Sequence, residues 1–351
     1  MSSDASQRDV VRAVVAFSLC SASLLLINKM TLKHLPMPSF VSSLQFVVSA
    51  VFVYGLKATR SAEVDDFEWR LLKPYSLYVL MFVATIYCNM KALQHANVET
   101  LIVFRSCVPI VVSGLDWAFL GRELPSRRSQ LALAMLTLGA AGYVATDRQF
   151  SLRARAYAWV TAYFFIISVE MAYGKLIVGS HLKLKSMWSP TLYTNTLSVG
   201  PMLLAGLLTD ETRLLRRTEW EAHGVALLLL SCVVGVAISY TGWRCRQLVS
   251  ATCYTIVGVG NKMATVLVNV LIWDEHASAL GIGCLVLCLL GASAYRQAPL
   301  RDAKGGADGG GARLLLCRRR RAVEACVAHS SAAVGATLRI AQRRLAVRRR
   351  A

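Results

Sequence analysis

The residues of this sequence with the clearest capacity for chemistry are three charged side chains that stand inside apolar segments. Arg105, Glu170 and Lys262 each lie well within such a segment. A charge at the centre of a bilayer costs at least about 2.5 to 3.5 kcal/mol, so each of them needs a partner or a function. If one cation pairs with Glu170 only to hold helices together, the other still lacks a counter-ion. The excess of deep cations therefore indicates an anionic small-molecule substrate.

The residues before Lys262 have a spacing that suits such a substrate. Tyr254, Gly258, Asn261 and Lys262 occupy positions i, i+4, i+7 and i+8, so they share one face of a helix in a stripe about 12 Å long. An aromatic ring, a gap for close approach, an amide and an ammonium group suit a base or sugar together with phosphates. Close helix packing is the alternative reason for Gly258.

Two other segments carry polar groups of the same kind. Arg105 is followed four residues later by Pro109, which cannot donate to the Arg105 carbonyl, so a bend is expected where the charge lies. A guanidinium can bind phosphate bidentately.

Tyr193 and Asn195 stand near the start of another segment. The Asn195 amide could read the edge of a base, and capping or helix packing is the alternative that stays open.

The composition predicts the elements that position these groups. Of 351 residues, 55% are hydrophobic and 17% are charged, which is typical of a chain surrounded mostly by lipid. We therefore expect an all-α membrane protein with ten transmembrane helices, at 10–31, 38–58, 74–93, 98–120, 128–146, 154–178, 188–209, 222–243, 249–272 and 277–296.

The ten segments divide into two halves of five, 10–147 and 148–297, after a short N-terminus at 1–9. Because five is odd, the second half must enter the membrane from the opposite side, so any repeat between the halves is inverted. The fourth segment of each half supports this prediction, since Arg105 precedes Asp116 and Trp117 much as Lys262 precedes Trp273 and Asp274.

The charge distribution predicts the orientation. Residues 298–351 form a Gly- and Arg-rich tail whose composition predicts disorder, with 13 Lys and Arg against 3 Asp and Glu. A basic tail after the last helix favours a cytosolic location for both termini and contact with anionic lipid. The basic residues of the short loops, with Arg244 and Arg246 assigned to one of them, favour the same orientation. Nucleic acid is the weaker interpretation, because the tail lacks interleaved aromatic residues.

Enzyme and metal chemistry find little support. No His and Cys cluster has the spacing of metal ligands, and no cofactor is expected. Glu170 is the one carboxylate in its segment, and Asp65 and Asp66 lie in a polar loop where solvation accounts for them. The first segment begins after about nine residues, so no cleavable signal or transit peptide is expected.

These segments together resemble the nucleotide-sugar transporters of the drug/metabolite transporter superfamily, which includes the plastid triose-phosphate translocators. Gly258-Val259-Gly260-Asn261-Lys262 is similar to the GALNK motif of GDP-sugar transporters, and Leu192-Tyr193-Thr194-Asn195 to their FYNN motif. Asn89-Met90-Lys91, Phe104-Arg105-Ser106 and Tyr143-Val144-Ala145-Thr146-Asp147 resemble the plant-type members that carry GDP-fucose and related GDP-sugars.

The resemblance implies a multi-pass Golgi antiporter that exchanges cytosolic GDP-sugar for lumenal GMP, with GDP-fucose as first choice before GDP-mannose and GDP-galactose. It implies that Tyr193 and Asn195 bind guanine and that Asn261 and Lys262 face the sugar and phosphates. Thr194 stands where the family has Asn, and a hydroxyl offers one donor where an amide offers two. The alternatives are a sugar-phosphate antiporter of the same fold and, in another class, an integral-membrane transferase; a homodimer stays open.

Overall fold

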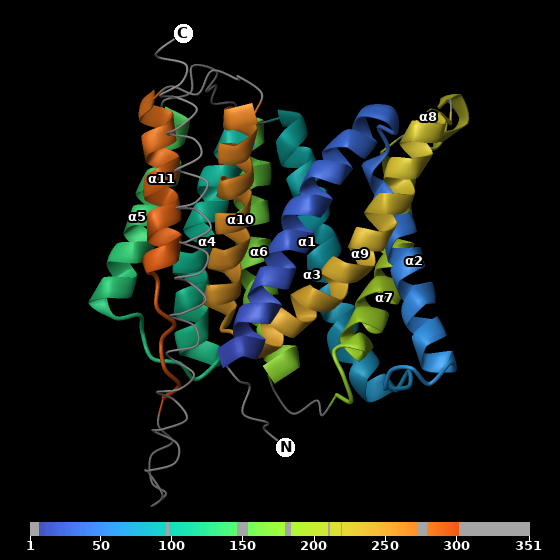
Figure 1. Ribbon diagram of the computed structural model, residues 1–351, viewed down its shortest axis with the longest axis horizontal. Coiled ribbons are helices and arrows are strands. Elements are labelled where there is room, and N and C mark those ends of the chain that lie inside the picture. The colour runs from blue at the N-terminus through green and yellow to red at the C-terminus, as the bar shows by residue number, and fades with distance from the viewer. Residues whose placement is uncertain are drawn as a thin grey trace, which may run out of the picture. The chain divides into compact units, whose positions relative to one another are not determined.

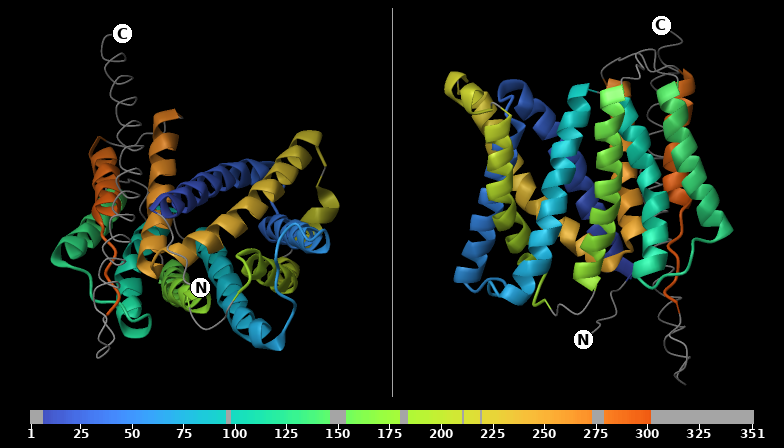
Figure 2. Two further views of the ribbon diagram at one scale, coloured as in Figure 1. Left: turned by 60° about the horizontal axis from the view of Figure 1, so that its bottom comes forward. Right: turned by 180° about the vertical axis from the view of Figure 1, so that it is seen from behind.

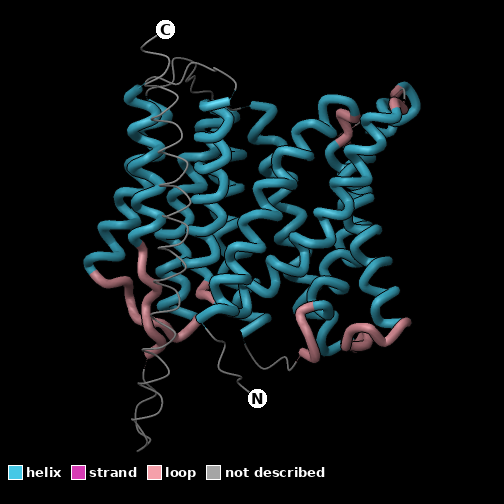
Figure 3. Tube along the Cα trace, viewed as in Figure 1, coloured by secondary structure: helices cyan, strands magenta, loops and turns pink. Residues whose placement is uncertain are grey.

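The computed structural model describes residues 7–95, 98–145, 154–179, 184–209, 211–218, 220–272 and 279–301, and all structural statements below concern these residues. They form eleven helices and one isolated bridge between Arg122 and Leu300, and the described ranges contain no strand (Figure 3). The expected all-α class is therefore confirmed.

The helices carry the labels of Figure 1. Their bounds are α1 Gln7–His34, α2 Pro38–Ala58, α3 Trp69–His95, α4 Val98–Phe119, α5 Arg127–Ala145, α6 Ala154–Gly179, α7 Trp188–Leu208, α8 Glu211–Arg217, α9 Ala222–Leu248, α10 Ala251–Ile272 and α11 Ala279–Ala294.

A helix covers each of the ten expected segments, and five helices of the described part are long and apolar enough to cross a membrane: α1, α2, α3, α6 and α9. Two details differ from expectation. The short helix α8 was not expected, and α9 continues five residues beyond the expected end at 243, to Leu248. Arg244 and Arg246 therefore lie in a helix, and their assignment to a loop was wrong.

The chain divides into two compact units that do not follow the order of the sequence. Unit 1 contains residues 1–15, 92–164 and 248–351, and unit 2 contains residues 16–91 and 165–247. Each unit combines helices from both expected halves of the sequence. In unit 1, α4 packs with α10 and α5 with α11, and in unit 2, α2 packs with α7.

Within unit 1, two glycines bring α5 and α11 into backbone contact, and Figure 2 shows these helices side by side. A Cβ added at Gly139 of α5 would lie 2.6 Å from the backbone nitrogen of Cys288. A Cβ added at Gly291 of α11 would lie 2.6 Å from the backbone nitrogen of Leu136. Since real Cβ atoms do not approach backbone this closely, both positions require glycine.

Within unit 2, α2 and α7 are each fastened at the N-terminus by a carboxylate that follows the other helix. Glu211, three residues after α7, accepts hydrogen bonds from the backbone N–H groups of Ser39 and Phe40 of α2, at 3.0 and 3.1 Å. Asp65, seven residues after α2, accepts from the hydroxyl of Ser189 of α7 at 2.7 Å. Carboxylates satisfy the unpaired donors and the positive dipole of a helix start, so these contacts hold the two helices together.

Candidate functional site

Arg105 of α4 lies half-buried against Tyr163 of α6 and Gly258 of α10, all within unit 1. Its Nη1 donates a hydrogen bond to the hydroxyl of Tyr163, a side chain that is almost fully buried. A Cβ added at Gly258 would lie 3.9 Å from Nη2 of the same guanidinium. The structure thus brings together Arg105 and the stripe on α10, two features that the sequence could place only on separate helices.

The guanidinium of Arg105 keeps its charge without a carboxylate partner in the described part of the chain. Its hydrogen-bond acceptor there, the Tyr163 phenol, is neutral and cannot offset a positive charge. Pro109 lies one turn further along α4 and leaves the Arg105 carbonyl without its intrahelical donor. The guanidinium suits a negatively charged group of a ligand, and the carbonyl suits a hydrogen-bond donor.

The stripe on α10 is described as far as Asn261. Tyr254, Gly258 and Asn261 are half-buried on this helix. Lys262 belongs to the helix, but its side chain lies outside the described residues, as do Trp273 and Asp274. The geometry of the ammonium group therefore stays a prediction, while the positions of the aromatic ring, the gap and the amide along α10 are fixed.

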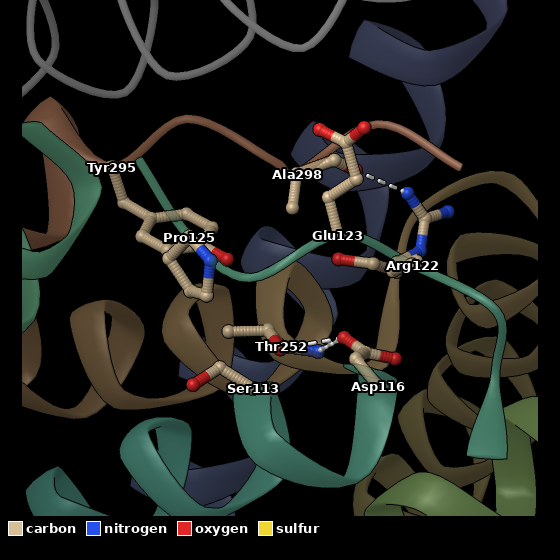
Figure 4. A pocket seen from close by; sticks show the side chains of 9 residues that line it. Ser113, Asp116, Arg122, Glu123, Pro125, Thr252, Tyr295 and Ala298 are labelled. Carbon is tan, nitrogen blue, oxygen red and sulfur yellow. Dashed lines mark hydrogen bonds between the residues drawn. The ribbon is translucent and has the colours of Figure 1, made fainter. Parts of the chain in front are cut away.

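Asp116 positions α10 relative to α4 (Figure 4). Its Oδ2 accepts from the backbone nitrogen of Thr252 at 2.9 Å and from the Thr252 hydroxyl at 2.5 Å. Thr252 lies in the first turn of α10, so the buried carboxylate caps that helix from α4. This cap holds the start of α10 against α4, and these two helices carry Gly258 and Arg105 of the candidate site.

Glu170 pairs with Arg246, a cation that the sequence analysis did not expect as its partner. Nη2 of Arg246 lies 3.3 Å from Oε1 of Glu170, and both side chains are at most 7% exposed. The hydroxyl of Tyr78 donates to the same oxygen at 3.0 Å, and the guanidinium lies 5.5 Å from the ring centres of Tyr78 and Trp243. Because Arg246 compensates Glu170, the carboxylate gives Arg105 no counter-ion, which strengthens the case for an anionic ligand.

Tyr193 and Asn195 lie on α7 in unit 2 and are enclosed by protein. The ring of Tyr193 stacks on that of Tyr75 at 5.3 Å between centroids, and its hydroxyl donates to the backbone carbonyl of Asp66. The Asn195 amide donates to the Thr191 carbonyl at 2.7 Å, one turn earlier in the same helix. Thr194 donates to the Pro190 carbonyl at 2.7 Å and accepts from the Trp243 indole at 3.3 Å. These groups have protein partners in this conformation.

Asp65 differs from expectation, whereas Asp66 behaves as a solvated group. Asp65 is buried and exchanges two hydrogen bonds with Ser189, so solvation does not account for it. The Asp66 carboxylate is 74% exposed and accepts from Lys57 Nζ at 2.6 Å. The hydrogen bond and the positive charge of Lys57 lower the pKa of Asp66 below its usual value.

Sequence reasoning missed Tyr163, Tyr75 and Arg246 as parts of this arrangement. A signal existed for Arg246, because the aromatic residues Tyr240 and Trp243, three positions apart, continue the helical pattern up to the cation pair. No signal existed for Tyr163 or Tyr75, since a tyrosine in an apolar segment is ordinarily a core residue.

Comparisons with known proteins agree with this fold. Residues 11–145 match the model of the EamA-like transporter family. The chain is 39% identical to the "GDP-fucose transporter 1" of Arabidopsis thaliana, over 82% of this chain and 86% of that protein. It is 32% identical to the "GDP-mannose transporter GONST3" of the same plant, over 84% and 80%. A solved crystal structure of a protein shows the same fold, with a TM-score of 0.62 at 14% identity, covering 81% of this chain and 95% of the other.

The chain therefore belongs to the nucleotide-sugar transporters of the drug/metabolite transporter superfamily. Since the matched relatives are named as transporters, it is a membrane transport protein and not an enzyme.

Proposed function

We propose that this protein carries a GDP-sugar across the Golgi membrane in exchange for GMP, with GDP-fucose preferred over GDP-mannose and GDP-galactose. The substrate class is supported by the relatives named for GDP-fucose and GDP-mannose. The order of preference follows the higher identity to the GDP-fucose transporter, 39% against 32%.

The observation that carries the proposal is the charge of Arg105. It lies half-buried inside the described part of the bundle, next to Gly258, with the neutral Tyr163 hydroxyl as its acceptor. A diphosphate supplies the missing negative charge and accepts two parallel hydrogen bonds from a guanidinium. In this role Arg105 and Lys262 neutralise the diphosphate, and Asn261 contacts the sugar.

In the same proposal, Tyr193 and Asn195 bind the base. An aromatic ring offers a stacking face and an amide offers both a donor and an acceptor to guanine. The hydrogen bonds that these groups make in this conformation would then be exchanged for contacts with the base. Tyr254 and Gly258 provide a second aromatic face and room for close approach on α10.

Exchange follows from electrostatics in an alternating-access cycle. An empty site with two uncompensated cations reorients slowly, because moving bare charge through the bilayer is costly. A nucleotide removes that charge, so only the loaded protein reorients quickly and each GDP-sugar entering is matched by a GMP leaving.

The ten-span, five-plus-five inverted repeat belongs to the proposal as well. Three of the helix pairs that pack within the units, α2 with α7, α4 with α10 and α5 with α11, join the equivalent helices of such a repeat. The reciprocal contacts of Glu211 with α2 and of Asp65 with α7 have the same symmetry. We also propose that both termini lie in the cytosol and that the basic tail contacts anionic lipid. A homodimer belongs to the same proposal.

The test is uptake into proteoliposomes that contain purified protein. Uptake of GDP-fucose should be several-fold faster when the vesicles are preloaded with GMP than when they are empty. It should be inhibited by external GMP and hardly affected by inorganic phosphate. Inhibition by phosphate instead of GMP would indicate a sugar-phosphate antiporter, and uptake independent of preloaded GMP would refute exchange.

A further inference from the structure

The side chain of Tyr193 is covered by α3 and by the loop that joins α2 to α3. Its ring stacks on Tyr75 with an angle of 10° between the planes, and Phe67 meets its edge at 5.0 Å between centroids. Its hydroxyl donates to the Asp66 carbonyl, and the residue has 0% exposed surface. A base that stacks on Tyr193 and bonds its hydroxyl needs the places that Tyr75 and Asp66 occupy.

A set of hydrogen bonds fastens this cover to the start of α7. The backbone N–H of Asp65 donates to the Ser189 hydroxyl at 2.8 Å, and that hydroxyl donates back to the Asp65 carboxylate at 2.7 Å. The same carboxylate accepts from the backbone N–H of Lys185 at 2.9 Å. The Ser186 hydroxyl donates to the Glu63 carbonyl. The charged acceptor is buried, so its bonds are stronger than those of an exposed loop.

The cover also contains a feature that makes it easy to displace. The Tyr75 hydroxyl is buried without a hydrogen-bond partner among the described residues. A buried donor that finds no acceptor destabilises the arrangement that buries it. Release of Tyr75 from Tyr193 therefore restores a hydrogen bond, which partly offsets the stacking that is lost.

We propose that the loop between α2 and α3, together with Tyr75, is a gate over Tyr193 that must open before a nucleotide base can bind there. The gate consists of Glu63, Asp65, Asp66, Phe67 and Tyr75, and Ser189 is its anchor on α7. In the closed state Tyr75 takes the stacking position of the base and the Asp66 carbonyl takes the acceptor position on the Tyr193 hydroxyl. This inference rests on the proposed role of Tyr193 in binding the base.

A redox-controlled lock tests the gate. In the double variant Asp65→Cys, Ser189→Cys, a disulfide can join the two positions that now share hydrogen bonds of 2.7 and 2.8 Å. The reduced variant should take up GDP-fucose, oxidation should lower uptake at least tenfold, and dithiothreitol should restore it. The two single-cysteine variants control for oxidation of the native thiols and should not respond.

A second variant tests the gate without a cross-link. Tyr75→Phe removes the unpaired hydroxyl and keeps the stacked ring, so it should stabilise the closed state. The KM for GDP-fucose should then rise about fivefold or more, together with the melting temperature. A purely structural role of Tyr75 would raise the melting temperature and leave KM unchanged.

Tyr54→Phe is the matched control, because it removes the same hydroxyl from an exposed ring of α2 outside the gate; its KM and uptake should equal those of the wild type. Uptake by the oxidised double variant at the rate of the reduced one, or an unchanged KM for Tyr75→Phe, would overturn the gate. Failure of the wild type to take up any GDP-sugar would instead refute the proposed function, so the two failures are distinguishable.

Discussion

Arg246 and Glu170 form an ion pair of 3.3 Å that is almost fully removed from the surface, with side chains 7% and 2% exposed. The guanidinium also lies against Gly174, where an added Cβ would be 2.0 Å from Nη1. Cation, carboxylate, the Tyr78 hydroxyl and the adjacent rings therefore form one packed cluster that joins α3, α6 and α9 in unit 2.

Removal of one partner of this pair should destabilise the protein strongly. Arg246→Met leaves Glu170 buried and uncompensated, which costs about 3 to 5 kcal/mol, whereas Glu170→Leu combined with Arg246→Met should recover most of the loss. Thermal unfolding in detergent measures both. If the loss of stability in the double variant equals the sum of the losses in Arg246→Met and Glu170→Leu alone, the ion pair is not the source of the effect.

The cap that Glu211 provides to α2 should be measurable in the same way. Glu211→Ala removes the acceptor for the Ser39 and Phe40 N–H groups and should cost about 1 to 3 kcal/mol. Glu221→Ala is the control, because it removes a carboxylate that is 64% exposed and lies 3.2 Å from Nδ1 of His34. That control should change stability by less than about 0.5 kcal/mol. Equal effects of the two variants would contradict the capping role.

The contact between α5 and α11 predicts a difference between two glycines of one helix. Gly291→Ala places a methyl group 2.6 Å from backbone of α5 and should destabilise by about 1 to 3 kcal/mol. Gly283→Ala has no heavy atom within 4 Å of the new methyl group and should stabilise by about 0.5 to 1 kcal/mol through helix propensity. Melting temperatures that move together would show that the two helices do not pack as described.

Transport should depend on Arg105 and on the hydroxyl that holds it. Arg105→Gln should lower GDP-sugar uptake at least about 100-fold with little loss of stability, since the removed interaction is charge recognition. Tyr163→Phe removes the acceptor of Arg105 and should raise KM about fivefold while kcat stays within twofold, since a single hydrogen bond is lost. A fall in kcat without a change in KM would assign Tyr163 to another step.

Lys262 of α10 is also predicted to bind the phosphates of the substrate. Lys262→Ala should abolish uptake while the protein keeps its elution profile and melting temperature, because the ammonium group is assigned to phosphate recognition. Uptake by this variant at the wild-type rate would remove Lys262 from the site.

The sequence predicts the helices well and the partners of the deep charges poorly. Hydropathy places a helix at all ten expected ranges, because apolar length decides which segments form helices in lipid. It ends the eighth segment at Trp243, because two arginines follow, and so it misses that Arg246 continues α9 as the counter-ion of Glu170. Only packing shows that a buried carboxylate has taken this cation.

The candidate site is likewise predicted only in part by the sequence. Periodicity correctly places Tyr254, Gly258 and Asn261 on α10, and the contact of Gly258 with Arg105 could not be inferred, since it depends on how α4 packs on α10. Asp65 looks like a solvated loop residue, because its partner Ser189 is 124 residues away in the sequence. Tertiary contacts of this kind leave no local pattern.

Uptake of labelled nucleotide sugars by proteoliposomes preloaded with GMP measures whether the protein transports a GDP-sugar. A panel of GDP-fucose, GDP-mannose, GDP-galactose and UDP-galactose, each offered alone, gives the comparison. We expect saturable uptake of GDP-sugars, fastest for GDP-fucose, and little uptake of UDP-galactose. Uptake of UDP-galactose at the rate of the best GDP-sugar, or no uptake of any GDP-sugar above empty liposomes, would contradict this expectation.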